Sequence, residues 1–131
     1  MGNGKFTADF GKTADDYARH RAGYPDWLFE RLVRRGLARP GMRALDLATG
    51  TGYLARGLAQ RGLGVTGIDI APDMMTAAKA LDAAQGLSID YIVGQAEATG
   101  LPAENFDLVT AACCWHWFDR PKASAEALRL L

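Results

Sequence analysis

The stretch from Ala44 to Leu54 constrains this chain most, because an apolar run there ends at an acid and passes through two glycines into a helical pattern. This order of residues predicts a strand, a tight turn and the start of a helix. Gly50 and Gly52 permit positive φ angles and carry no Cβ atom, so the peptide groups of the turn can closely approach a small molecule. The stretch therefore predicts a βα unit with a ligand-binding turn.

A second acid, Asp69, closes the next apolar run, which begins at Gly64. In a βαβ unit, Asp46 and Asp69 would stand at the carboxyl ends of adjacent parallel strands. An acid about 20 residues after the glycines is placed to accept hydrogen bonds from both hydroxyls of a ribose. The two acids together predict a cofactor that carries a nucleoside.

The remaining sequence alternates between short apolar runs and helical patterns. We predict helices at 13–22, 26–38, 52–61, 72–85 and from about 121, and strands at 42–47, 64–69, 88–93 and 106–112. Such alternation is typical of an α/β fold with a parallel sheet and helices on both faces. We expect a single domain over 1–131, in which 1–40 form an arm and lid helices and 41–131 form the core.

Composition excludes several classes of partner. The 131 residues have a formal net charge of zero, so no overall field attracts nucleic acid or an anionic membrane, and no apolar run is long enough to cross a bilayer. Cys113 and Cys114 are adjacent, which gives neither a zinc-ligand spacing nor a disulfide framework, and we expect both to be small core residues. We expect a cytoplasmic protein without a metal, a nucleic-acid partner or a membrane anchor.

The glycine pattern at 50–55 has the form G-x-G-x-x-A, which dinucleotide oxidoreductases also use. Asp46 lies four residues before Gly50, where a carboxylate would repel a pyrophosphate and attract an ammonium group. S-adenosylmethionine carries an ammonium and no phosphate. The residues therefore favour S-adenosylmethionine, and an NAD-binding oxidoreductase is the less favoured alternative.

These motifs resemble those of the class I S-adenosylmethionine-dependent methyltransferases. The similar segments are 44–52 for the first motif, 67–74 for the second, 94–97 for the adenine loop and 106–110 for the fourth strand. Two more segments, 17–25 and 115–119, are similar to the subgroup of trans-aconitate-type and other small-molecule methyltransferases. The resemblance covers about residues 13–131.

The resemblance implies a Rossmann-like sheet with the strand order 3-2-1-4, truncated relative to the seven-stranded fold of the family. The chain also departs from the family in having Ala48 where a glycine is common. The strand at 106–112 would then be an edge, although its residues read as a buried strand. We expect this edge to be covered by a second copy of the chain or by a missing C-terminal half.

For the nucleoside, the resemblance assigns Asp69 to the ribose and Ile70 and Met74 to the faces of the adenine. Gln95 would accept a hydrogen bond from the adenine amino group, and the backbone at Ala96 would contact the ring edge.

For the methionine end, the resemblance assigns Asp46 to the ammonium group. The peptides at Ala48 and Gly50 would lie along the methionine, and Gly52 would complete the cofactor-binding turn. Two residues of the lid, Tyr17 and Arg21, would close over the amino-acid end, and an exposed position on the helix surface is their other interpretation.

The implied activity is methyl transfer from S-adenosylmethionine to a small-molecule acceptor at oxygen, nitrogen or a carboxylate, with S-adenosylhomocysteine as product. Alignment would supply most of the catalysis, because a sulfonium is already an activated methyl donor. His116 is the candidate base or substrate-orienting donor, and packing under the lid is its other interpretation. The alternative function is a non-catalytic cofactor-binding or assembly module derived from a methyltransferase.

Overall fold

The computed structural model describes residues 23–131. Its elements in chain order are α3 (Asp26–Arg34), β1 (Arg43–Leu47), α4 (Tyr53–Ala59), β2 (Gly64–Asp69), α5 (Pro72–Ala84), β3 (Asp90–Val93), β4 (Leu108–Ala111), the short 3₁₀ helix η1 (Trp115–Trp117) and α6 (Arg120–Leu130). Every strand and helix predicted within the described residues is present, with some ends shifted. The predicted helix at 13–22 lies outside the described residues, and η1 was not predicted.

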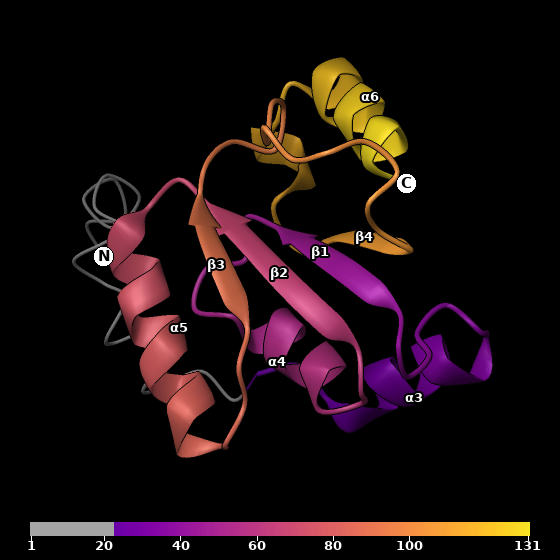
Figure 1. The fold of residues 1–131 in the computed structure, drawn as a ribbon, viewed down its shortest axis with the longest axis vertical. Coiled ribbons are helices and arrows are strands. Elements are labelled where there is room, and N and C mark those ends of the chain that lie inside the picture. Colours follow the sequence, from indigo (N-terminus) through magenta and orange to yellow (C-terminus); the bar gives the residue numbers. More distant parts are fainter. Residues whose placement is uncertain (1–22) are drawn as a thin grey trace, which may run out of the picture.

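The strands form one parallel sheet in the order β3-β2-β1-β4. At the carboxyl end of β1, Leu47 lies between Ile68 of β2 and Ala111 of β4. In Figure 1, β2 and β3 point toward the same end of the molecule, and the loops that follow the strands and α6 lie at that end. The predicted Rossmann-like order 3-2-1-4 is confirmed.

Each face of the sheet has its own apolar core, as expected for alternating side chains in strands that are buried on both faces. One core joins the sheet to α3 and α4 and includes Phe29, Ala44, Leu58 and Val65. The other joins the sheet to α6. Its buried members are Leu45, Leu47, Ile68, Ala96, Phe106 and Leu130.

Helix α3 is shorter than predicted and ends at Arg34, not at Ala38. Gly36 adopts a φ of 74°, and the Leu37 amide donates back to the Leu32 carbonyl at 2.9 Å. This left-handed glycine and the backward hydrogen bond are the usual way to end a helix. Ala38 therefore belongs to the connection, where its side chain is buried in the first core.

No helix in residues 23–131 combines the length and the apolarity that a membrane crossing requires.

Candidate functional site

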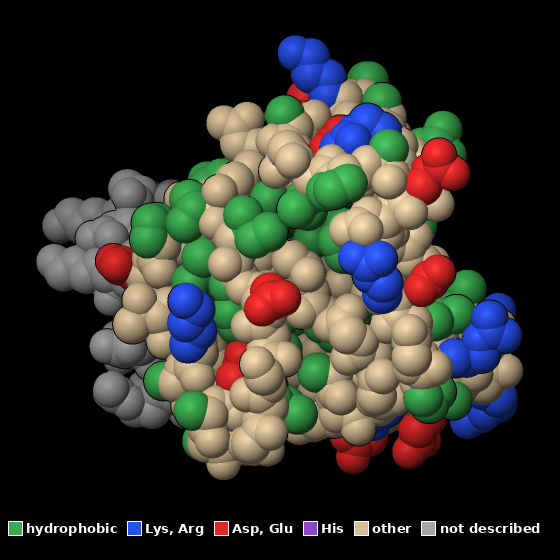
Figure 2. All heavy atoms as spheres, in the orientation of Figure 1, with side chains coloured by type: hydrophobic (Ala, Val, Ile, Leu, Met, Phe, Trp, Pro, Cys, Tyr) green, Lys and Arg blue, Asp and Glu red, His purple; other side chains and the backbone are tan. Residues whose placement is uncertain are grey.

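A cavity of about 1030 Å³ opens at the carboxyl ends of the strands. Segments at the ends of all four strands contribute to its wall, including 48–51 after β1, 69–71 at the end of β2, 94–97 after β3 and 112–114 after β4. Figure 2 shows hydrophobic side chains gathered on the visible face, among interspersed acidic and basic ones. Seven residues predicted to bind the cofactor line the cavity: Ala48, Gly50, Asp69, Ile70, Met74, Gln95 and Ala96.

The turn after β1 presents bare backbone to this cavity. Gly50 has a φ of 59°, and a Cβ atom built at this position would meet nothing within 4 Å. The missing side chain therefore leaves open space above the peptide rather than making room for another part of the protein. This open backbone fits a ligand that lies along the turn.

The Asp69 carboxylate is held in a fixed orientation at the cavity wall. Its Oδ2 accepts a hydrogen bond from the Gly50 amide at 2.9 Å, and its Oδ1 accepts one from the Ala71 amide at 2.9 Å. An ionised carboxylate offers about four acceptor sites, so both oxygens can accept another hydrogen bond. Asp69 thus joins the glycine turn to the start of α5 and can still bind a diol.

An apolar surface lies beside Asp69. Ile70 lines the cavity with 68% of its surface exposed, whereas Met74 lines it from a buried position in α5. Gln95 and Ala96 contribute from the loop after β3. A large exposed isoleucine next to a fixed carboxylate fits a ligand that has a flat apolar part beside a polar one.

Asp46 lies beneath the turn and is not among the residues that line the cavity. Its Oδ2 accepts from the Thr49 hydroxyl at 2.8 Å and its Oδ1 accepts from the Thr110 hydroxyl at 2.7 Å. Burial raises the pKa of Asp46 to about 6, although both hydroxyls act in the opposite direction. Thr49 lines the cavity, so its hydroxyl connects the buried Asp46 carboxylate to the cavity wall. Contact with an ammonium group stays a prediction.

Gly52 also lies away from the cavity lining. A Cβ atom at this position would stand 2.6 Å from Tyr91 Oη and 2.9 Å from Arg56 Nη1. Such distances are far below van der Waals contact, and the φ of 85° also favours glycine. The glycine at 52 is therefore required by the interior of the protein, not by the approach of a ligand.

The aromatic segment after β4 contributes Trp117 and Phe118 to the cavity wall. His116 is exposed and is not among the lining residues. Its ring packs against Trp117, with centroids 4.8 Å apart. The catalytic role of His116 stays a prediction.

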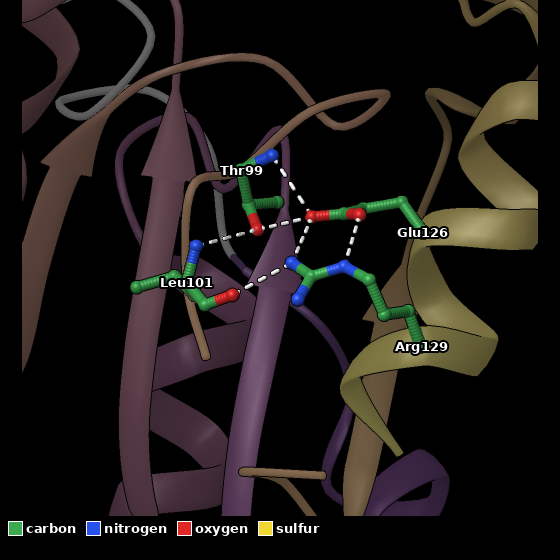
Figure 3. Close-up of polar contacts among 4 residues, drawn as sticks. All are labelled: Thr99, Leu101, Glu126 and Arg129. Carbon is green, nitrogen blue, oxygen red and sulfur yellow. Dashed lines mark hydrogen bonds and ion pairs between the residues drawn. The ribbon is translucent and has the colours of Figure 1, made fainter. Parts of the chain in front are cut away.

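The loop that carries Gln95 and Ala96 is fastened to α6. Glu126 Oε2 accepts from the Thr99 amide at 3.0 Å and from the Thr99 hydroxyl at 2.5 Å, and Arg129 donates to both Glu126 oxygens at 2.7 Å. Arg129 also donates to the Leu101 carbonyl at 2.6 Å. Figure 3 shows Glu126 and Arg129 reaching from α6 to this loop. The Arg129 guanidinium and the Thr99 donors lower the pKa of Glu126 to about 2.

Sequence reasoning missed part of the wall. Cys113 was expected in the core, but it is exposed at a φ of 60° and lines the cavity. Cys114 is buried, its thiol donates to the Leu47 carbonyl, and burial raises its pKa to about 11. The sequence signal that could have placed these cysteines near the cavity is their position directly after a predicted strand.

Two further wall residues are Asp119, the N-cap of α6 at the end of the segment 115–119, and Lys122 of α6, which no motif had indicated. Tyr17 and Arg21 lie outside the described residues. Within residues 23–131, no group of three or more His, Cys, Asp or Glu side chains is placed to hold a metal ion.

Three comparisons connect this geometry to known proteins. The family model described as "Methyltransferase domain" matches residues 45–131. An uncharacterized methyltransferase of Mycobacterium tuberculosis is 36% identical over 126 residues, which cover 93% of this chain and 47% of that protein. The malonyl-[acyl-carrier protein] O-methyltransferase of Serratia marcescens is 36% identical over 102 residues, which cover 77% of this chain and 38% of that enzyme.

A solved structure from Methanococcus maripaludis, assigned to the S-adenosyl-L-methionine-dependent methyltransferases, shares the fold. It superposes with a TM-score of 0.81 over 94% of this chain and 60% of that one, at 21% identity. The chain spans about half the length, or less, of the two curated relatives named above. The matched family model, the sheet order and the relatives agree with the motifs, and the chain belongs to the class I S-adenosylmethionine-dependent methyltransferase family.

Proposed function

We propose that the cavity binds S-adenosylmethionine and that the protein transfers its methyl group to a small-molecule acceptor at oxygen, nitrogen or a carboxylate. The observation that carries this proposal is the Asp69 carboxylate, which two backbone amides orient at the cavity wall. An ionised acceptor forms hydrogen bonds about twice as strong as a neutral one does. A ribose diol is the part of the cofactor that matches such a group.

The other wall residues support the same ligand. Ile70 and Met74 offer apolar surface for the adenine, and the Gln95 side chain and the Ala96 backbone offer polar groups for its edge. Ala48 and Gly50 would hold the methionine part along their peptide groups. The buried carboxylate of Asp46 would favour the ammonium through Thr49 or a water molecule.

Bound S-adenosylmethionine supplies a sulfonium, whose methyl group is already activated for transfer. The contribution of this chain is to hold the donor in one orientation and to exclude water from the reacting centre. In-line alignment of two reactants can supply several kcal/mol of the barrier, so a dedicated base is not required. Trp117 and Phe118 offer apolar surface on the side of the cavity that follows β4.

For the acceptor, the relative from Serratia marcescens is named as an O-methyltransferase that acts on a malonyl group. This name supports a carboxylate among the acceptors proposed here. We also propose a reduced, cytoplasmic setting, which the two free cysteines support. Acidic and basic side chains are interspersed on the face in Figure 2, which supports a small molecule rather than a nucleic acid as substrate.

Calorimetric titration with S-adenosylhomocysteine tests the binding half of this proposal. We expect the wild-type chain to bind and Asp69→Ala to bind about 100-fold more weakly, because two charge-assisted hydrogen bonds are lost. Asp73→Ala is the matched control, since Asp73 is an exposed acid in the first turn of α5 and does not line the cavity. Unchanged affinity in Asp69→Ala would contradict the assignment.

A further inference from the structure

A buried ion pair lies under the glycine turn. Arg56 of α4 and Asp82 of α5 are 3.0 Å apart, and each side chain is only 4% exposed. Neither residue belongs to the sequence motifs or faces the cavity. The pair therefore has no direct role in the cofactor binding and methyl transfer proposed for the cavity.

Arg56 connects this pair to the turn. Its Nη1 donates to the Thr51 carbonyl at 2.8 Å and to Asp82 Oδ1 at 3.0 Å. The peptide between Gly50 and Gly52 is thus held from the interior by Arg56, while the Gly50 amide is held from the cavity side by Asp69. Two charged side chains, Arg56 and Asp69, therefore hold the turn from opposite sides.

Tyr91 of β3 completes the cluster. Its hydroxyl occupies the space next to Gly52 where a side chain would stand, and burial followed by the nearby Asp82 carboxylate raises its pKa. Within the described residues, two further buried polar atoms of this region have no hydrogen-bond partner: Thr51 Oγ1 and Arg56 Nη2. Buried polar atoms without partners lower the contribution of this cluster to the stability of the fold.

The free-energy cost of burying charge also indicates that the ion pair contributes little to stability. Replacing a buried ion pair by apolar residues of similar volume is often neutral or stabilising, whereas removing one partner leaves an uncompensated charge and is strongly destabilising. Stability alone therefore does not explain a charged pair at this position. What an apolar pair would lack is the donor to the Thr51 carbonyl.

We propose that Arg56, held in place by Asp82, is a positioning residue that fixes the Gly50–Gly52 turn for the amino-acid end of the bound ligand. This inference rests on the proposed function, because it names the part of the ligand that the turn serves. Arg56 acts through the backbone and does not touch the ligand. Asp69 and the loop after β3 serve the nucleoside instead.

The double variant Arg56→Met/Asp82→Val tests the proposal, because it removes both charges and leaves apolar side chains of similar total volume. Its affinity is measured for S-adenosylhomocysteine and for 5′-methylthioadenosine, which has the nucleoside but no amino-acid end. We expect a midpoint of urea unfolding close to that of the wild type and about tenfold weaker binding of S-adenosylhomocysteine. The affinity for 5′-methylthioadenosine should change much less. Equal weakening for both ligands would overturn the proposal.

Arg56→Lys supplies the conservative rescue, because a single nitrogen of Arg56 makes both the bond to Thr51 and the bond to Asp82. We expect the lysine variant to recover part of the lost selectivity for S-adenosylhomocysteine. Val65→Ala is the control for general destabilisation, since Val65 is buried in the core shared with α3 and α4. It should lower the stability without changing the ratio of the two affinities.

Amide hydrogen exchange tests the inference without any ligand. In the wild type, the Gly50 amide is bonded to Asp69 and the Gly52 amide to the Thr49 carbonyl. We expect both amides to exchange about tenfold faster in the double variant, while amides of β1 stay unchanged. Unchanged exchange at Gly50 and Gly52 would overturn the inference. If the wild type bound neither ligand, the proposed function would fail, and exchange would still decide the role of Arg56.

Discussion

Ala48 adopts a φ of 50° at the end of β1, a left-handed conformation that is unfavourable for a residue with a Cβ atom. The class I methyltransferases that this chain resembles commonly have glycine at this position, and here alanine adopts the left-handed conformation. The strain of a left-handed L-residue is about 1–2 kcal/mol. Ala48 therefore lowers the stability of the very turn that forms the floor of the cavity.

Ala48→Gly should stabilise the folded chain by about 0.5 kcal/mol. The relief of strain exceeds the greater conformational freedom that glycine gives to the unfolded chain, which costs roughly 0.5–1 kcal/mol. Urea unfolding measures the difference. Ala80→Gly is the matched control, because Ala80 is exposed in the interior of α5 and the same change there should cost about 1 kcal/mol. Destabilisation by Ala48→Gly would show that the left-handed alanine is not strained.

Most cavity residues that belong to a motif were predictable, but Asp46 and Gly52 of the first motif do not line the cavity. Asp69 and Gly50 were predicted at the site because an acid and a glycine at this spacing near strand ends are typical of a nucleoside-binding turn. Arg56 and Glu126 were missed, because a charged residue in a helical pattern reads as a solvent-exposed position. Only the fold brings Arg56 under the turn and Glu126 against the loop that carries Gln95.

At the level of elements, Asp46 joins three segments that meet at the site. It belongs to β1, and its two oxygens accept from Thr110 of β4 and from Thr49 of the turn. The carboxylate is 3% exposed, so the charged form loses most of its hydration. The same group that orders the ends of β1 and β4 thus destabilises the fold when it is ionised.

This burial predicts a pH dependence. The pKa of Asp46 is raised from 3.8 to about 6 on folding, so between these values the folded state holds a proton that the unfolded state has released. Stability from this group is therefore present below pH 4 and falls as the pH rises to 6, by about 3 kcal/mol in total. Urea unfolding across this range should show the loss in the wild type but not in Asp46→Asn. Parallel pH profiles of the two proteins would contradict the buried, ionisable role of Asp46.

The elements themselves were largely predictable. Four apolar runs separated by helical patterns require a parallel sheet, and right-handed crossovers leave few possible orders for its strands. The predicted end of α3 at residue 38 was wrong, because Leu37 continues the apolar periodicity beyond Gly36. The left-handed backbone at Gly36 ends the helix. The connection from β3 to β4 carried no periodicity that would have revealed its fastening to α6.

For the whole molecule, β4 forms an edge of the sheet that is described over residues 23–131. β4 pairs with β1 on one side only, so its outer backbone groups have no strand beside them within the described residues. Its side chains pack into both cores, as in a central strand: Leu108 contacts the first core, and Val109 and Ala111 contact the second. An uncovered apolar edge of this kind is a template for pairing with another chain.

We propose that a second copy, or the part of a longer protein that the relatives contain, covers β4. The 131-residue chain on its own should therefore self-associate, most simply through a two-fold axis that places two β4 strands side by side. Sedimentation velocity over a wide range of concentration measures this, and the mean sedimentation coefficient should rise with concentration. Binding of S-adenosylhomocysteine should persist in the associated form, because Asp69 and Ile70 lie at the end of β2, on the opposite side of β1 from β4. A stable monomer at every concentration would show that the edge is protected from within the chain.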